Sequence, residues 1–154
     1  MTQKQALEIL KMGYNVFLTG SAGSGKTFVL NQYINYLKKK KVNIGITAST
    51  GIAATHMNGI TIHSWSGMGI KDKLSDKDIQ KLLKRKRLKR NFDRTKVLVI
   101  DEISMLHHFQ LDLVNRICRA FRQMMSRLVA CRRYYAEIFS NCLRLARKII
   151  KFVL

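Results

Sequence analysis

A short glycine-rich stretch near the start of the chain has the residue types and spacing of a phosphate-binding loop. It reads G-S-A-G-S-G-K-T and comprises Gly20, Ser21, Ala22, Gly23, Ser24, Gly25, Lys26 and Thr27. Glycines let backbone N–H groups converge on phosphate oxygens, and a helix that begins here adds the positive end of its dipole. In such a loop Lys26 reaches the β- and γ-phosphates, and the Thr27 hydroxyl binds Mg²⁺. We therefore predict a nucleoside triphosphate site rather than a chance glycine turn before a surface helix.

Two consecutive acids, Asp101 and Glu102, could supply the rest of a hydrolytic site. They end the apolar run V-L-V-I, which is typical of a buried parallel strand. Where such a strand meets bound phosphates, Asp101 helps to hold Mg²⁺, and Glu102 orients and deprotonates the attacking water. The alternative is an ordinary acidic strand end, and the loop upstream favours the hydrolytic interpretation.

The segments around these residues predict the elements that position them. Apolar runs at 15–19, 42–49 and 96–100 predict strands, and periodic stretches at 28–37 and 106–122 predict helices. Strands that alternate with helices indicate an α/β domain with a mostly parallel sheet.

Two further stretches have helical spacing. Residues 2–13 predict a short helix that Thr2 caps and Gly13 ends. Residues 71–96 are rich in Lys and Arg and have leucines at helical spacing. We interpret them as a surface helix or a basic insert.

The charge balance of the chain favours a polyanionic partner. There are 29 Lys and Arg residues against 9 Asp and Glu, which gives a formal net charge of +20 at pH 7. Nucleic acid is favoured over a membrane, because no apolar run approaches the roughly 20 residues of a spanning helix and the N-terminus has no signal-peptide pattern. The three cysteines lack paired spacing, so we expect reduced thiols in an intracellular protein of the cytoplasm or nucleoid.

Three further motifs, taken together with the loop, resemble one family. They are T-A-S-T-G-I-A-A at 47–54, T-I-H-S at 61–64 and V-I-D-E-I-S-M-L at 99–106. In this order they resemble the PIF-one/RecD-like DNA helicases of superfamily one, over residues 2–123. The resemblance implies a P-loop NTPase (RecA-like) fold, in which a parallel sheet is flanked by helices. It also implies an ATP-dependent motor that uses Mg²⁺ and moves along single-stranded DNA in repair, recombination or telomere-type maintenance; it names no protein partner.

The same resemblance assigns contacts to individual residues. Gln3 matches the adenine-reading glutamine of the family. Two segments match parts of the motor that touch the DNA strand, and their residues are Thr47, Ser49, Thr50, Gly51, His63, Ser64 and Trp65. Hydroxyl and N–H groups near a helix start suit phosphate contacts, and His63 and Trp65 could stack on a base or hydrogen-bond to it. For Trp65, packing in the core is an equal alternative.

The resemblance stops after Gln123. The family has a glycine–proline turn, a further core strand and a G-D-x-x-Q-L-P-P motif there, whose glutamine senses the γ-phosphate. Codons compatible with residues 124–154, read one nucleotide earlier, can encode N-D-E-P-F-G-G-M-Q-A-V-L-C-G-D-F-F-Q-L-P-P-V. We therefore interpret 124–154 as a frameshifted basic tail, which leaves the sheet one core strand short and one of its edges unpaired.

The tail as translated also predicts an element of its own. Its apolar residues have the spacing of a basic amphipathic helix, so we expect a helical C-terminal tail. The positions on that face are Ile138, Cys142, Leu145, Ile149 and Phe152.

Three functions compete at this point. The first is the N-terminal part of a helicase motor, which we expect to show no unwinding and little ATPase activity alone. A P-loop kinase explains the loop but neither T-A-S-T-G-I-A-A nor T-I-H-S. A non-catalytic ATP- or nucleic-acid-binding module would bind single-stranded DNA without turnover, and its affinity would fall steeply with salt.

Overall fold

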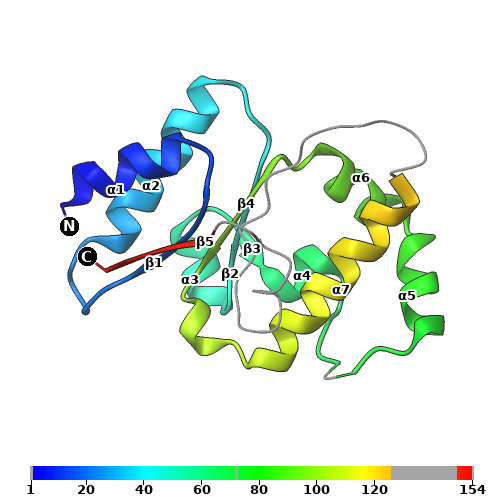
Figure 1. The fold of residues 1–154 in the computed structure, drawn as a ribbon. Coiled ribbons are helices and arrows are strands. Elements are labelled where there is room, and N and C mark those ends of the chain that lie inside the picture. The colour runs from blue at the N-terminus through cyan, green and yellow to red at the C-terminus, as the bar shows by residue number, and fades with distance from the viewer. Residues whose placement is uncertain (1, 72, 126–148, 154) are drawn as a thin grey trace. The chain divides into compact units, whose positions relative to one another are not determined.

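The computed structural model describes residues 2–71, 73–125 and 149–153. By internal packing the chain forms two compact units. The described residues of the first unit are 2–44, 96–98 and 149–153, and those of the second are 45–71, 73–95 and 99–125 (Figure 1). The phosphate-binding loop lies in the first unit, whereas Asp101 and Glu102 lie in the second.

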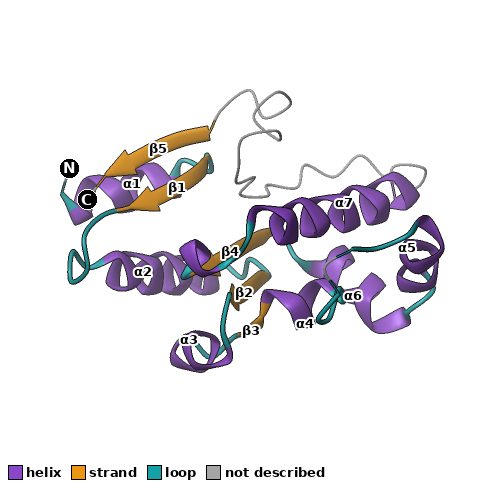
Figure 2. Ribbon diagram, turned by 90° about the horizontal axis from the view of Figure 1, so that it is seen from below, coloured by secondary structure: helices purple, strands orange, loops and turns teal. Residues whose placement is uncertain are grey.

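The first unit contains two helices and a two-stranded sheet. Helices α1 (Gln3–Lys11) and α2 (Lys26–Lys39) pack against each other, and strand β1 (Asn15–Thr19) pairs in parallel with β5 (Ile149–Val153) (Figure 2). The predicted cap of α1 is present. The Thr2 hydroxyl accepts a hydrogen bond from the Gln5 N–H, and the Gln5 side chain accepts one from the Thr2 N–H.

Strand β5 corrects the prediction of a helical tail. Ile149 and Phe152, which the apolar spacing assigns to a helix, both belong to β5. The helix is wrong at these positions because the sequence Ile-Ile-Lys-Phe-Val favours a strand, and β1 offers an edge with which it can pair. Strand β1 therefore has β5 as a parallel partner. The other positions of the predicted helix, Ile138, Cys142 and Leu145, lie outside the described residues.

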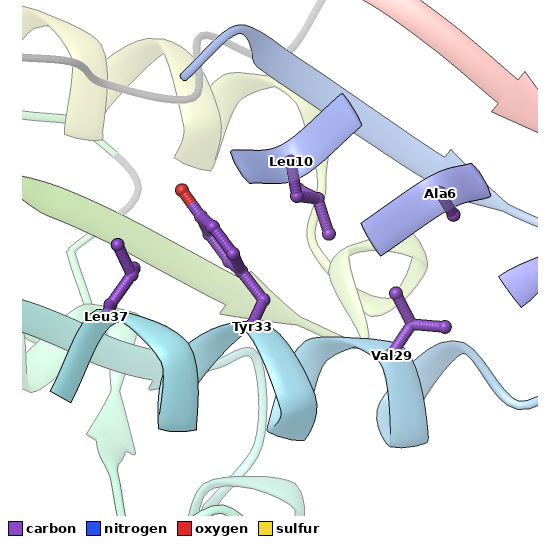
Figure 3. Packing of buried hydrophobic residues seen from close by; sticks show 5 residues of the cluster. All are labelled: Ala6, Leu10, Val29, Tyr33 and Leu37. Carbon is purple, nitrogen blue, oxygen red and sulfur yellow. The ribbon is translucent and has the colours of Figure 1, made fainter. Parts of the chain in front are cut away.

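The core of the first unit lies between its two helices. Ala6 and Leu10 of α1 face Val29, Tyr33 and Leu37 of α2 (Figure 3). A spacing of four residues brings these side chains to one face of each helix. Burial raises the pKa of the Tyr33 phenol. The stability gained by burying the neutral ring is therefore present below a pH of about 10 and is lost at higher pH.

The second unit combines a three-stranded sheet with a group of helices. The strands of the sheet are β2 (Ile44–Ala48), β3 (Ile60–Thr61) and β4 (Val97–Asp101), in the order β3–β2–β4. The first residues of β2 and β4 are counted with the first unit. Strands β2 and β3 are parallel. The helices are α3 (Gly51–His56), α4 (Ile62–Ser66), α5 (Asp76–Leu83), α6 (Lys86–Arg94) and α7 (His108–Met125), and a 3₁₀ turn covers Ile103–Met105 (Figure 1).

An aromatic column holds three of these helices together. The ring of Trp65 in α4 lies 4.7 Å from the ring of Phe92 in α6, measured between centroids. Phe92 in turn stacks on Phe121 of α7 at 4.2 Å. All three side chains are buried. Gly67 ends α4 with a φ of 79°, and a Cβ there would collide with Leu88 of α6, so glycine permits the close approach of the two helices.

Most of the other predicted elements are confirmed. The basic stretch 71–96, interpreted as a surface helix or a basic insert, forms two helices, α5 and α6. The described strands form two sheets, β1 with β5 and β3–β2–β4. No helix in the described part of the chain is long and apolar enough to cross a membrane.

Candidate nucleotide and DNA-strand sites

The phosphate-binding loop connects β1 to α2. Its backbone depends on two glycines in the left-handed region, Gly23 with a φ of 76° and Gly25 with a φ of 86°. Gly25 is the N-cap of α2, so Lys26 and Thr27 occupy the first turn of that helix. The N–H groups at this end lack partners within the helix, which is what an anionic phosphate requires.

Lys26 is folded over its own loop. Its Nζ donates hydrogen bonds to the carbonyl oxygens of Gly20 at 3.0 Å and Ser21 at 2.9 Å. The ammonium group is therefore held where phosphate oxygens can replace the two carbonyls. The Ser24 hydroxyl is buried and has no hydrogen-bond partner among the described residues, and Thr27 is exposed. Free donors, an exposed hydroxyl and a cation fit a nucleotide phosphate with its metal ion.

Gln3, the predicted adenine-reading residue, contacts the loop. Its side-chain Nε2 donates a hydrogen bond to the Ser24 carbonyl at 3.1 Å. A Cβ on Gly25 would collide with the Gln3 amide, so the absence of a side chain at this position makes room for the contact. The capping box of α1 fixes Gln3 at the start of that helix.

Asp101 and Glu102 lie where β4 gives way to the 3₁₀ turn. The Asp101 carboxylate accepts a hydrogen bond from the Glu102 N–H at 3.0 Å, and the Asp101 carbonyl accepts one from the Ser49 N–H at 3.2 Å. Glu102 has a φ of 51°, in the left-handed region, and its side chain is exposed. Such a backbone is uncommon for a residue with a side chain and often accompanies functional sites.

Residues 47–51 divide between structural and accessible groups. Thr47 is fully buried, and its hydroxyl donates to the Val99 carbonyl at 2.7 Å, which ties β2 to β4. The Ser49 hydroxyl is buried without a partner among the described residues. The Thr50 hydroxyl accepts a hydrogen bond from the Ala53 N–H and caps α3. Gly51 is exposed, and a Cβ there would have no atom within 4 Å.

The predicted DNA-contact residues of α4 lie in different environments. Thr61 caps the helix by accepting a hydrogen bond from the Ser64 N–H at 3.2 Å. Ser64 is exposed and His63 is half-buried. Trp65 is only 4% exposed and belongs to the aromatic column with Phe92. The structure therefore favours core packing for Trp65, because stacking on a base would require the ring to leave the core.

Comparison with protein families decides the relationship of the chain. A family model described as PIF1-like helicase matches residues 2–130. The chain belongs to the PIF1-like helicase family. This confirms the resemblance found in the sequence motifs. The match extends past residue 123, where the motif-based resemblance ends, and α7 continues to Met125.

Curated relatives of this PIF1-like chain are much longer proteins. It is 63% identical over 123 residues to "ATP-dependent DNA helicase Pif1" of Psychrobacter sp. (strain PRwf-1), which covers 80% of this chain and 19% of that protein. It is 45% identical over 117 residues to "ATP-dependent DNA helicase RRM3" of Saccharomyces cerevisiae, which covers 75% of this chain and 16% of that protein. The chain thus spans less than a fifth of these relatives.

Solved structures of PIF1-like helicases share the fold. The crystal structure of Pif1 helicase from Candida albicans has a TM-score of 0.74 at 37% identity, over 79% of this chain and 28% of that one. Pif1 helicase from Bacteroides in complex with ADP-AlF3 and ssDNA has a TM-score of 0.56 at 31% identity, with the same coverages of 79% and 28%. The predicted fold class, a P-loop NTPase with a parallel sheet flanked by helices, is confirmed.

Some contacts of the site could not be found in the motifs. The hydrogen bond from the Ser49 N–H to the Asp101 carbonyl joins residues far apart in sequence, and no local pattern predicts it. The cap at Thr61 had a signal, since threonine before a helix is a common N-cap. The capping box of α5, formed by Ser75 and Asp78, was equally visible in the sequence.

Proposed function

We propose that this chain is the ATP-binding and strand-contacting part of an ATP-dependent DNA helicase, and that it uses Mg²⁺ together with ATP. The observation that carries the proposal is the loop geometry. Lys26 bridges two loop carbonyls at the start of α2, and Gln3 is hydrogen-bonded to the same loop. Membership of the PIF1-like helicase family supports a nucleotide-driven motor over a kinase.

Each residue of the nucleotide site has a distinct role in this proposal. Lys26 binds the β- and γ-phosphates, and Gln3 reads the adenine. Thr27 and Asp101 hold Mg²⁺, whose preference for oxygen ligands suits a hydroxyl and a carboxylate. Glu102 orients the attacking water and takes its proton. Bound ATP supplies the phosphoryl group whose transfer to water drives the motor.

The DNA-strand contacts are assigned to the accessible groups of the second unit. Thr50 and Gly51 lie at the N-terminus of α3, and His63 and Ser64 lie on α4. Thr47 supports them from β2 and Ser49 from the residue that follows this strand, and the Ser49 N–H links the segment to the backbone of Asp101. We propose single-stranded DNA as the partner and the cytoplasm or nucleoid as the location, because a DNA motor acts where its substrate lies.

Nucleotide binding by the purified chain tests this proposal. A fluorescent ATP analogue with Mg²⁺ should bind the wild-type chain, and Lys26→Ala should weaken binding by about ten- to a hundredfold, the value of one or two charge-assisted hydrogen bonds. Glu102→Gln is the matched control, because it should leave binding intact while removing any turnover. Equal affinity in Lys26→Ala and wild type would contradict the proposal. Single-stranded DNA binding without any nucleotide binding would support the non-catalytic module instead.

We also propose that residues 124–154 are the product of a shifted reading frame. The support is the shifted reading of compatible codons, which spells G-D-F-F-Q-L-P-P at the position where the family motif belongs. On this proposal the chain alone unwinds no DNA and hydrolyses little ATP, because the γ-phosphate sensor is missing. The nucleotide sequence around codon 123 tests this proposal. If the shifted frame does not encode G-D-F-F-Q-L-P-P, the frameshift proposal is wrong.

A further inference from the structure

The two helices of the basic stretch differ in how their charges are arranged along the helix dipole. Helix α5 begins with the Ser75–Asp78 capping box, has Asp76 in its first turn and has Lys81 in its last. This arrangement stabilises the helix dipole at both ends. Hydrogen bonds from Ser75 and then Lys71 hold the pKa of Asp78 well below its usual range, and Arg116 pairs with Asp76. The charges of α5 are thus largely compensated inside the protein.

The segment that follows, residues 84–94, concentrates positive charge instead. We call it the basic segment, and its cations are Lys84, Arg85, Lys86, Arg87, Lys89, Arg90 and Arg94. All of them are exposed. Within residues 2–71, 73–125 and 149–153 none of these cations forms an ion pair. The single acid of the segment, Asp93, is half-buried.

The position of these charges opposes the stability of α6. Arg85 is the N-cap residue and makes no side-chain capping hydrogen bond, and the first turn contains cations and no acid. Cations at the positive end of a helix dipole are unfavourable, and so are like charges four residues apart. Helical stability therefore does not explain the arrangement, whereas an external polyanion does.

Packing holds the cations on a fixed surface. Leu88 and Phe92 are buried on the opposite side of α6, where Phe92 contacts Trp65 of α4 and Phe121 of α7. On the outer side Lys86, Arg90 and Arg94 follow one another every four residues, or about 6 Å along the axis. Because the apolar side of α6 is used in the core, no apolar face is left to enter a membrane.

We infer that the basic segment binds the phosphates of a single DNA strand, as a contact surface additional to the proposed contacts on α3 and α4. The choice of DNA rests on the proposed function. The aromatic column fixes α6 against α4, and α4 carries His63 and Ser64, two of the proposed DNA contacts. The basic segment therefore lies next to the place where the strand is proposed to bind. A strand bound at α4 that continues onto α6 would meet a row of unpaired cations.

A neighbouring hollow favours a single strand over a duplex. It measures about 450 Å³ and is lined by residues of the second unit, among them Met68, Leu74, Leu82, Lys81 and Arg85. The three apolar side chains are buried, and the two cations are exposed. Lys71 and Asp78, which form an ion pair, also line the hollow. An apolar floor whose rim carries these cations besides one paired acid suits an unpaired base whose phosphate faces the rim. A duplex keeps its bases stacked inside and cannot use such a hollow.

Salt-dependent DNA binding tests the inference. The variant Lys86→Gln/Arg90→Gln/Arg94→Gln is compared with Lys38→Gln/Lys39→Gln/Lys40→Gln, which removes the same charge from exposed lysines at the end of α2. The probe is a fluorescein-labelled oligodeoxythymidylate without nucleotide, followed by anisotropy between about 50 and 200 mM salt. Loss of three phosphate contacts should reduce the magnitude of the negative slope of log K against log salt by about 2. It should also weaken binding at least about tenfold. The control variant should keep the wild-type slope.

Several outcomes would overturn the inference. They are an α6 variant with the wild-type slope, an equal fall of slope in the control, and an α6-dependent preference for a duplex of the same length. Binding to phosphatidylserine vesicles that needs the same cations, in place of DNA binding, would also overturn it. If the triple variant does not fold, Arg90→Gln alone should lower the slope by about 0.7.

The experiment also separates this inference from the nucleotide proposal. Lys26→Ala should keep the α6-dependent slope, because Lys26 lies outside the basic segment. If the chain binds no nucleotide but its DNA binding still depends on α6, the proposed ATP site is wrong and the inference about the basic segment holds. If the chain binds nucleotide but its DNA binding does not depend on α6, the ATP site holds and the inference is wrong.

Discussion

The phosphate-binding loop and the segment 47–65 are both rich in small polar residues, but the fold uses them differently. In the loop, the hydrogen bonds described for the Lys26 ammonium go to carbonyls of the loop itself, and the Ser24 hydroxyl has no partner among the described residues. In the segment, Thr47 ties two strands together, while Thr50 and Thr61 cap helices. A motif can therefore consist of free binding groups in one place and of structural groups in another.

The largest effect expected from this difference is at Trp65. Trp65→Ala should destabilise the chain by about 3–5 kcal/mol, because it leaves a cavity beside Phe92. Urea unfolding followed by circular dichroism measures the loss, and Trp65→Phe should restore part of it. A fully stable Trp65→Ala variant that has lost DNA binding would instead make Trp65 a base-stacking residue and break the comparison.

Two glycines of the loop give an intermediate effect with a built-in control. Gly25→Ala and Gly23→Ala should each cost about 1–2 kcal/mol of stability for the left-handed backbone. Only Gly25→Ala also displaces the Gln3 amide, since a Cβ on Gly23 would meet nothing within 4 Å. Affinity for the ATP analogue should thus fall further in Gly25→Ala. Equal affinities in the two variants would show that Gln3 does not contribute to nucleotide binding.

The smallest expected effect is at the cap of α3. Thr50→Ala should cost about 1 kcal/mol of stability, because the Ala53 N–H loses its acceptor, and Thr50→Ser should recover most of it. Thermal unfolding measures both variants. DNA affinity that falls in Thr50→Ala by much more than stability predicts, and returns in Thr50→Ser, would show that the hydroxyl also contacts the strand.

Local patterns predicted much of the fold, and they indicate the residues of the candidate nucleotide site. The loop with its helix is one local pattern, and the acidic end of β4 is another. Each pattern consists of residues close together in the sequence, so a single sequence suffices to find it. The capping box at Thr2 and the core strand of Val97–Asp101 follow from equally local signals. The family assignment from the ordered motifs is confirmed by the match to residues 2–130.

Long-range partners could not be predicted in the same way. Helical spacing at Ile149 and Phe152 suggested a helix, yet pairing with β1 decides for a strand, and that pairing depends on residues at the other end of the chain. The burial of Trp65 depends on Phe92 and Phe121, which reach it from two later helices. Sequence alone shows that such a residue is aromatic but not which neighbours it will meet.

The pairing of β1 with β5 also bears on the order of events during synthesis. Residue 15 finds its partner at residue 149, so the ribosome must add more than 130 residues before β1 can be paired there. At roughly 5–20 residues per second this interval is on the order of 10 s. Throughout that time the nascent chain exposes an apolar strand edge directly before the phosphate-binding loop, and such edges are where unfinished chains join one another. We therefore expect the emerging N-terminal part to depend on chaperone protection until β5 has been made.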